Sequence, residues 1–288
     1  FRPIYEHDGG RGAIMKRNIN SALRLIGICL FFILITTGAF AFQWPVQNLA
    51  ITATFGESRW GHFHSGIDIG GGEQEIRPIE DGELIFFHEE GSGPLDLPTG
   101  LGNFLVVEHE RGIRSLYAHM RPDTLDPQKT DLVKSDVIGI IGETGSSLGK
   151  HLHFEVVDRE FHQLVNPIRL LPALTDTTAP SIGIVELRRD TITQRIETGD
   201  RIISGKWSLV LEVYDVSEYV SYFCPMAPYL VQVYLNGSKA LAYVYESLEE
   251  HNGKLELVQS EGQTFDTLYL DDWLSSAGDI TVPEGEVQ

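Results

Sequence analysis

The stretch His151-Leu152-His153-Phe154-Glu155 decides how this chain is interpreted. It belongs to a short apolar run that is typical of a β-strand. Side chains at positions i and i+2 of a strand point to the same face, so His151 and His153 are predicted to project into one space. Phe154 and Val156 would then point to the opposite face, as a buried core requires.

Two neighbouring imidazoles would repel each other if both were charged, and a metal ion resolves this conflict. Zinc binds neutral imidazole and carboxylate oxygen, and catalytic zinc takes three protein ligands. His64 and Asp68 have a His-x-x-x-Asp spacing, and Gly66 lets the backbone bend between them. One histidine from the strand would complete a set of two nitrogens and one carboxylate.

Composition narrows the classes of protein to consider. The chain has 288 residues, 42% of them hydrophobic, which is enough for one large or two small cores. Lys and Arg number 22 against 41 Asp and Glu, and the formal net charge of −19 argues against a nucleic-acid partner. Cys29 lies in a segment that we expect to be removed, so Cys224 alone remains and a cysteine-based zinc site is excluded.

Residues 1–41 are predicted to be an upstream extension followed by a signal peptide that opens at Met15. The signal consists of a basic stretch, an apolar run and a small-x-small motif: Lys16, Arg17 and Arg24, residues 25–35, and Ala39-Phe40-Ala41. We expect cleavage after Ala41, with an uncleaved membrane anchor as the alternative. The chain is therefore expected to be exported, periplasmic or extracellular, and to contact the membrane only transiently through the leader unless the leader anchors it.

Residues 42–173 are predicted to form an all-β domain. Apolar runs recur between glycine-rich turns, and the spacing leaves no room for intervening helices. The predicted strands are residues 82–87, 103–108, 113–118, 137–141 and 151–157.

Residues 174–288 are predicted to form a second, β-rich domain after the linker Thr177-Thr178-Ala179-Pro180. Strands are expected at residues 208–214 and 230–235, and Asn236-Gly237 is a strong hairpin signal. The next strand places Tyr243 and Tyr245 on one face. From about Gly278 the sequence has no strong pattern, so we expect a small immunoglobulin-like β-sandwich that is incomplete or frayed at its end.

Several motifs occur in a fixed order along the N-terminal half. They are Thr54-Phe55-Gly56, His64-Ser65-Gly66-Ile67-Asp68, Pro78 with Asp81-Gly82, Gly100-Leu101-Gly102-Asn103, Tyr117-Ala118-His119, Gly142-Glu143-Thr144-Gly145-Ser146 and the stretch from His151 to Glu155. Together they resemble the M23 metallopeptidases, the LytM and lysostaphin group of peptidoglycan endopeptidases. The resemblance covers about 110 residues.

This resemblance implies an M23-type antiparallel β-sheet peptidase domain with His64, Asp68 and His153 as ligands of Zn²⁺. It implies that His119 and His151 line the site without binding the metal and act as acid, base or oxyanion donor, in an order that the sequence does not assign. Asp136, Leu148 and Lys150 depart from the usual pattern near the loops. The expected activity is hydrolysis of peptide bonds in bacterial peptidoglycan.

Three other functions are compatible with the same motifs. Some relatives have lost ligands and activate other wall hydrolases, whereas the ligand set here is intact. A zinc peptidase acting on other peptides would look the same, and a carbohydrate-binding module could use Trp60, Phe63 and Tyr117 for stacking. The C-terminal domain is expected to position the enzyme or to bind a protein partner.

Overall fold

The structure is a computed structural model that describes residues 42–282, except residues 60, 92–98, 125, 127, 223, 261–262 and 270–273. For residues 274–279 it describes the backbone alone. The predicted leader and Trp60 lie outside the described residues, so signal cleavage remains a prediction. A search of the described residues finds no helix that combines the length and the apolar character needed to span a bilayer.

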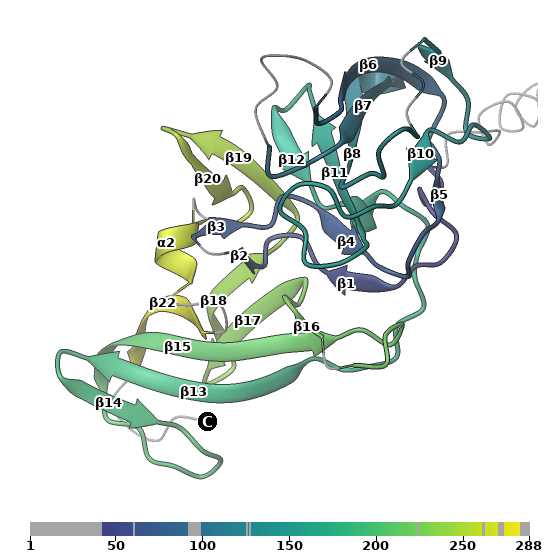
Figure 1. Cartoon of the computed structure of the whole chain (residues 1–288). Coiled ribbons are helices and arrows are strands. Elements are labelled where there is room, and N and C mark those ends of the chain that lie inside the picture. The colour runs from purple at the N-terminus through teal and green to yellow at the C-terminus, as the bar shows by residue number, and fades with distance from the viewer. Residues whose placement is uncertain are drawn as a thin grey trace, which may run out of the picture. The chain divides into compact units, whose positions relative to one another are not determined.

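Strands account for almost all the regular structure of residues 42–173, which we call the N-terminal part (Figure 1). The predicted all-β architecture is therefore confirmed. Two short 3₁₀ helices, η1 (Glu110–Gly112) and η2 (Pro167–Arg169), are also present. The strands are β1 (Ile51–Ala53), β2 (Ser58–Arg59), β3 (His62–Phe63), β4 (Ile67–Ile69), β5 (Glu75–Ile76), β6 (Gly82–His88), β7 (Phe104–His109), β8 (Ile113–Ala118), β9 (Asp131–Leu132), β10 (Gly139–Ile140), β11 (Leu152–Asp158) and β12 (Gln163–Val165).

The strands predicted from the apolar runs agree closely with the structure. β8 has the predicted bounds, β6 is one residue longer at its end, and β7 and β11 are each shifted by one residue toward the C-terminus. β10 is shorter than predicted, since only Gly139 and Ile140 pair with β5. Alternate residues of β7 are buried, which is the period of a strand with one face on a core.

The long sheet has β11 near its middle. Its order is β21-β20-β19-β12-β11-β8-β7-β6-β9, and β4 also pairs with β11 while β1 pairs with β4. Phe154 and Val156 of β11 are fully buried, as the alternation predicts. The core therefore lies under one face of β11 and leaves the other face for His153.

The C-terminal part, residues 174–282, is also built from strands (Figure 1). One sheet has the order β14-β13-β15-β16, with β22 paired to β15, and β17 and β18 form a separate two-stranded sheet. The elements are β13 (Ser181–Arg189), β14 (Ile192–Arg195), β15 (Gly205–Val216), β16 (Pro225–Met226), β17 (Leu230–Leu235), β18 (Ser238–Val244), β19 (Ser247–His251), β20 (Lys254–Leu257), β21 (Gln263–Thr264), the helix α2 (Phe265–Leu268) and β22 (Leu274–Val282).

The predicted hairpin at Asn236-Gly237 is present between β17 and β18. Both turn residues have positive φ, 49° at Asn236 and 77° at Gly237, as a two-residue hairpin turn of type I′ requires. Tyr243 and Tyr245 are both buried, and their rings contact each other with centroids 6.1 Å apart.

Two features of the C-terminal part differ from what the sequence predicts. β22 continues to Val282, beyond the point where the sequence pattern ends, because it pairs with β15 along its length. β19 pairs with β12 through Leu248 and Leu164, so residues 247–264 extend the sheet of the N-terminal part. The division of the chain at residue 173 remains a prediction, and strand pairing crosses it.

Candidate metal centre

Three of the predicted site residues converge on one point. His64 Nε2 lies 3.1 Å from Asp68 Oδ1 and 3.1 Å from His153 Nδ1, and His153 Nδ1 lies 2.9 Å from Asp68 Oδ1. The two histidines are buried and Asp68 is partly buried. These residues could hold one metal ion between two nitrogens and one oxygen.

Strand register explains the convergence. Asp68 on β4 is paired directly with His153 on β11, which places their side chains side by side. On the other side of β11, His153 is paired with Ala118, so His119 follows β8 directly into the same region. Three neighbouring strands therefore supply the chemistry of the site.

Each candidate histidine ligand is oriented by a hydrogen bond at its second nitrogen. His64 Nδ1 lies 2.8 Å from the carbonyl oxygen of Thr54, which leaves Nε2 for the cluster. His153 Nε2 lies 2.9 Å from Glu155 Oε1, which leaves Nδ1 for the cluster. Ser65 Oγ donates a hydrogen bond to the same carboxylate oxygen. Such outer contacts fix the tautomer and ring direction of metal-binding histidines.

The second oxygen of Asp68 is held as well. Arg59 donates to Asp68 Oδ2 at 3.2 Å and forms an ion pair with Glu57 Oε1 at 2.5 Å. Glu57 also accepts a hydrogen bond from the backbone N–H of Thr54. One carboxylate oxygen of Asp68 therefore faces the two histidines while the other is fixed by the guanidinium.

The charges of the cluster are coupled. Burial alone would raise the pKa of Asp68, but the charge of His64 and the hydrogen bonds from His153 and His64 outweigh burial and hold that pKa well below its usual range. Burial alone would lower the pKa of His153, but its hydrogen bonds to Asp68 and Glu155 raise that pKa to about 10. A proton on His153 thus balances two carboxylates in the metal-free cluster, and a cation would replace it.

The geometry of the three donors fits zinc. Tetrahedral ligands about 2.0–2.1 Å from zinc lie about 3.3 Å from one another, and the three donor atoms lie within a few tenths of an ångström of that separation. Two imidazole nitrogens and one carboxylate oxygen are also the donor types of catalytic zinc sites. The residues present therefore suit this ion.

His119 and His151 stand beside the cluster. Their ring centroids are 4.6 Å apart, and His119 lies 5.9 Å from the ring of His153. Nδ1 of His119 is 2.8 Å from the carbonyl oxygen of Thr144, and Nδ1 of His151 is 2.8 Å from that of Gly149. In both residues Nε2 is the nitrogen left for other partners.

The backbone and charge state of His119 are both unusual. Its φ of 58° lies in the left-handed region, which non-glycine residues rarely adopt and which concentrates at functional sites. Burial, followed by the charge of His151, lowers the pKa of His119 to about 4. The ring is therefore neutral at physiological pH and can accept a proton.

A cavity of about 770 Å³ lies over the cluster. His64, Asp68, His119, His151 and His153 all line it, so the five predicted site residues share one space. Residues of the C-terminal part line it too: Val213, Tyr214, residues 225–228, Tyr245 and Tyr269. We call Val213, Tyr214 and residues 225–228 the C-terminal wall. The volume is in the range of small-molecule and peptide sites.

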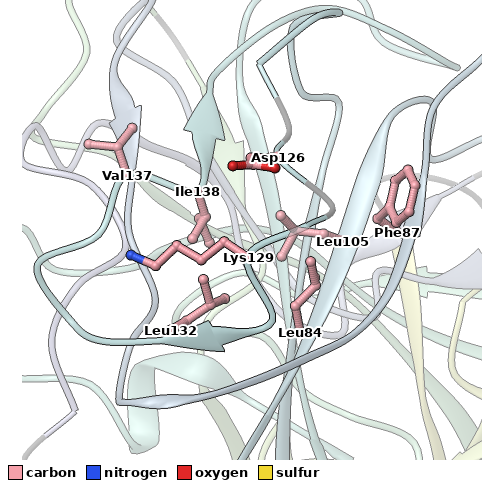
Figure 2. A pocket seen from close by; sticks show the side chains of 8 residues that line it. All are labelled: Leu84, Phe87, Leu105, Asp126, Lys129, Leu132, Val137 and Ile138. Carbon is pink, nitrogen blue, oxygen red and sulfur yellow. The ribbon is translucent and has the colours of Figure 1, made fainter.

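A second hollow lies away from the cluster, among β6, β7, β9 and β10 (Figure 2). It measures about 30 Å³, which is room for little more than a water molecule. Lys129, which lines it, is engaged in an ion pair with Asp136 at 2.6 Å. This hollow is too small to be a substrate site.

Sequence reasoning missed the residues that support the cluster. Glu155 could have been found, because it lies two positions after His153 on a strand and must share its face. Glu57 and Arg59 carry no comparable signal, since Arg59 contacts Asp68 from a different strand. His109, by contrast, is a buried structural residue that bonds to Ser115 Oγ at 2.7 Å.

Comparison with known proteins agrees with the site. A family model described as peptidase family M23 matches residues 62–167, and a second model, which has no functional description, matches residues 179–288. DD-carboxypeptidase/endopeptidase Mpg of Neisseria meningitidis is 29% identical over 46% of this chain and 29% of its own length. Murein hydrolase activator NlpD of Escherichia coli is 35% identical over 45% of this chain and 31% of its own length.

The chain thus spans about three tenths of the length of these curated relatives. A solved zinc-containing peptidase from Vibrio cholerae is 30% identical over 46% of this chain and 41% of that chain, with a TM-score of 0.38. The family match includes His64, Asp68, His119, His151 and His153 within its bounds. On this match, residues 62–167 of the chain are similar to peptidase family M23.

Proposed function

We propose that this chain is a zinc-dependent endopeptidase that hydrolyses peptide bonds in bacterial peptidoglycan. The observation that carries the proposal is the approach of His64, Asp68 and His153 to within 3.1 Å of one another at the base of a cavity. The names of the relatives Mpg and NlpD, a DD-endopeptidase and a murein hydrolase activator, support the cell wall as the target.

His64, Asp68 and His153 would hold the zinc ion. When bound, zinc lowers the pKa of a water molecule to about 7 and polarises the carbonyl of the bond to be cut. Arg59 and Glu155 keep the ligand atoms directed at that point through their contacts with Asp68 and His153. These two contacts would hold the ligand side chains in their binding positions before substrate binds.

His119 and His151 would handle the protons. In both residues Nδ1 is bonded to a backbone carbonyl, which leaves Nε2 available for substrate or water. One ring accepts the proton of the attacking water at Nε2 and delivers it to the leaving amine. The other, when protonated at Nε2, donates a hydrogen bond to the oxyanion that develops on the carbonyl oxygen.

The proposal is tested by digesting purified peptidoglycan with zinc-loaded protein and reading the released fragments by mass spectrometry. The expected result is a set of fragments with new amino and carboxyl ends, absent with Asp68→Ala. An equal yield from Asp68→Ala, or no fragments from the wild type, would overturn it.

One alternative has an observation in its favour. NlpD is named as a murein hydrolase activator, so this chain could be a catalytically silent scaffold that activates other wall hydrolases. Such a scaffold would release no fragments by itself but would raise the yield of fragments from an added wall hydrolase. A zinc peptidase of other substrates would instead cleave casein-like peptides and leave peptidoglycan intact. The same digestion assay, run with both additions, separates these outcomes.

Action on the cell wall implies a location outside the cytoplasm, periplasmic or extracellular. The relatives' names support this location. Fractionation of cells that express the full protein, followed by immunodetection, tests it. Recovery in the cytoplasmic fraction alone would contradict it.

A further inference from the structure

The cavity over the metal cluster is enclosed by two stretches of chain that are far apart in sequence. Leu101, Ser146 and Leu148 of the N-terminal part line it, and Leu148 is 94% exposed. The C-terminal wall (Val213, Tyr214 and residues 225–228) lines it from the other segment. A peptide in this cavity would therefore contact both parts of the chain.

The C-terminal wall is fastened to the loop that precedes the first candidate ligand. Thr54 Oγ1 donates to the carbonyl oxygen of Ala227 at 2.8 Å, and the Cys224 thiol donates to that of Thr52 at 2.9 Å. Thr54 is also the residue whose carbonyl oxygen bonds to His64. The wall thus has a fixed position relative to the cluster.

Local structure adds to this rigidity. Pro225 and Met226 pair with Val216 and Asp215 of β15, so the wall is an edge of the C-terminal sheet. Pro225 and Pro228 lie at the two ends of residues 225–228, and proline restricts both its own φ and the preceding residue. A rigid wall can discriminate between ligands without losing free energy to ordering.

The C-terminal wall contains no charged side chain. None of Val213, Tyr214 and residues 225–228 is charged, whereas the charged side chains of the cavity, Glu57 and Arg59 among them, come from residues 57–153. Met226 is half-buried and packs at the rim of the core, and an unbranched thioether adapts to apolar groups of varied shape. A charged group placed against this wall would lose hydration without gaining a charged partner from the wall itself.

We propose that the C-terminal wall, through Met226, determines specificity by accepting uncharged parts of the peptide substrate. The proposal rests on the proposed peptidase function. It assigns a role in substrate selection to the C-terminal part, whose sequence carries no catalytic motif.

The test uses the full chain loaded with zinc and soluble stem-peptide fragments from purified peptidoglycan. Met226→Ala is expected to raise KM about threefold to tenfold through lost apolar contact, with kcat within about twofold and zinc near one per chain. Met226→Glu should raise KM further, because it places an unpaired charge on the wall. Met226→Leu conserves volume and should stay within about twofold of wild type.

Leu230→Ala is the matched control, since Leu230 is an exposed residue of the same segment that does not line the cavity. Thermal melting shows that each variant is folded. Equal KM values for Met226→Glu, Met226→Ala and Leu230→Ala would overturn the proposal.

Binding separates this inference from the proposed activity. If wild type binds the fragments by calorimetry without cleaving them, peptidase function fails, and weaker binding by Met226→Glu than by Leu230→Ala would still support the wall. If wild type neither cleaves nor binds them, both proposals are overturned.

Discussion

The metal cluster and the C-terminal wall face the same cavity but are built by different means. The cluster is assembled by strand register, with Asp68 opposite His153 and His119 at the end of the next strand. The wall reaches the cavity through a few tertiary contacts, such as that of Thr54 with Ala227. We have proposed that the cluster acts in hydrolysis and that the wall acts in substrate selection. Mutations in the cluster should then lower kcat or zinc binding, whereas mutations in the wall should raise KM.

The largest expected effect lies in the cluster. Asp68→Ala removes the oxygen donor and should lose bound zinc, with hydrolysis falling by about a thousandfold or more because the pKa of the attacking water returns toward about 15.7. Metal analysis after dialysis and the peptidoglycan assay measure both effects. Asp131→Ala, an exposed aspartate on β9, should change neither. Retention of one zinc per chain in Asp68→Ala would contradict the ligand assignment.

Next in size is the removal of a proton carrier. Under the proposed mechanism, His119→Ala should lower kcat by about 10²–10⁴-fold while zinc stays near one per chain, because this ring would move a proton at Nε2 without binding the ion. His251→Ala, on the exposed end of β19, is the control. Full activity of His119→Ala would refute the catalytic role.

A smaller effect is expected one contact away from the ion. Glu155→Gln weakens the bond that orients His153 and should lower zinc affinity about 10- to 100-fold. Competition with a zinc-binding dye gives the affinity. The control is Glu83→Gln, at an exposed position of β6, which should have the zinc affinity of wild type. If Glu155→Gln binds zinc as tightly as Glu83→Gln, Glu155 does not orient His153.

A change of pH should alter the affinity of the cluster for zinc, and the uncharged wall should not contribute to this change. The pKa of His153 is raised to about 10 in the metal-free protein, so a proton competes with zinc at this ring throughout the neutral range. Raising the pH removes that proton, and apparent zinc affinity should rise by up to about tenfold per unit between about pH 6 and about pH 8. Competition titrations across this range measure it. An affinity that is flat or falls with rising pH would contradict the prediction.

The smallest effect concerns the packing that joins the N-terminal part to the C-terminal part. Tyr269 OH donates to the carbonyl oxygen of Gly56 and lies 2.9 Å from Tyr245 OH. Tyr269→Phe removes both contacts and should reduce the free energy of unfolding by about 1–3 kcal/mol. Urea unfolding measures the loss, and Tyr222→Phe, at an exposed position, should show almost none. Equal stability of the two variants would show that this junction contributes little.

The sequence carries signals for the cluster because the relevant patterns are local. His151, His153 and their neighbours follow the two-residue period of a strand, and the His-x-x-x-Asp spacing of His64 and Asp68 is short. The M23 resemblance then placed these segments together, and the structure brings all five predicted site residues to one cavity.

The junction and the wall could not be predicted in this way. Ala227 meets Thr54 across 173 positions and Tyr269 meets Gly56 across 213, and no periodicity reports such pairs. The extension of the sheet by β19 likewise depends on the exposed edge of β12. Contacts of this kind are set by the tertiary fold and leave no local signal.

The central claim is that His64, Asp68 and His153 together bind one zinc ion. The most direct measurement is anomalous X-ray diffraction at the zinc absorption edge from crystals of the zinc-loaded protein. We predict one peak per chain, within bonding distance of His64 Nε2, Asp68 Oδ1 and His153 Nδ1. A peak at another position, or none at these three atoms with zinc in excess, would contradict the account.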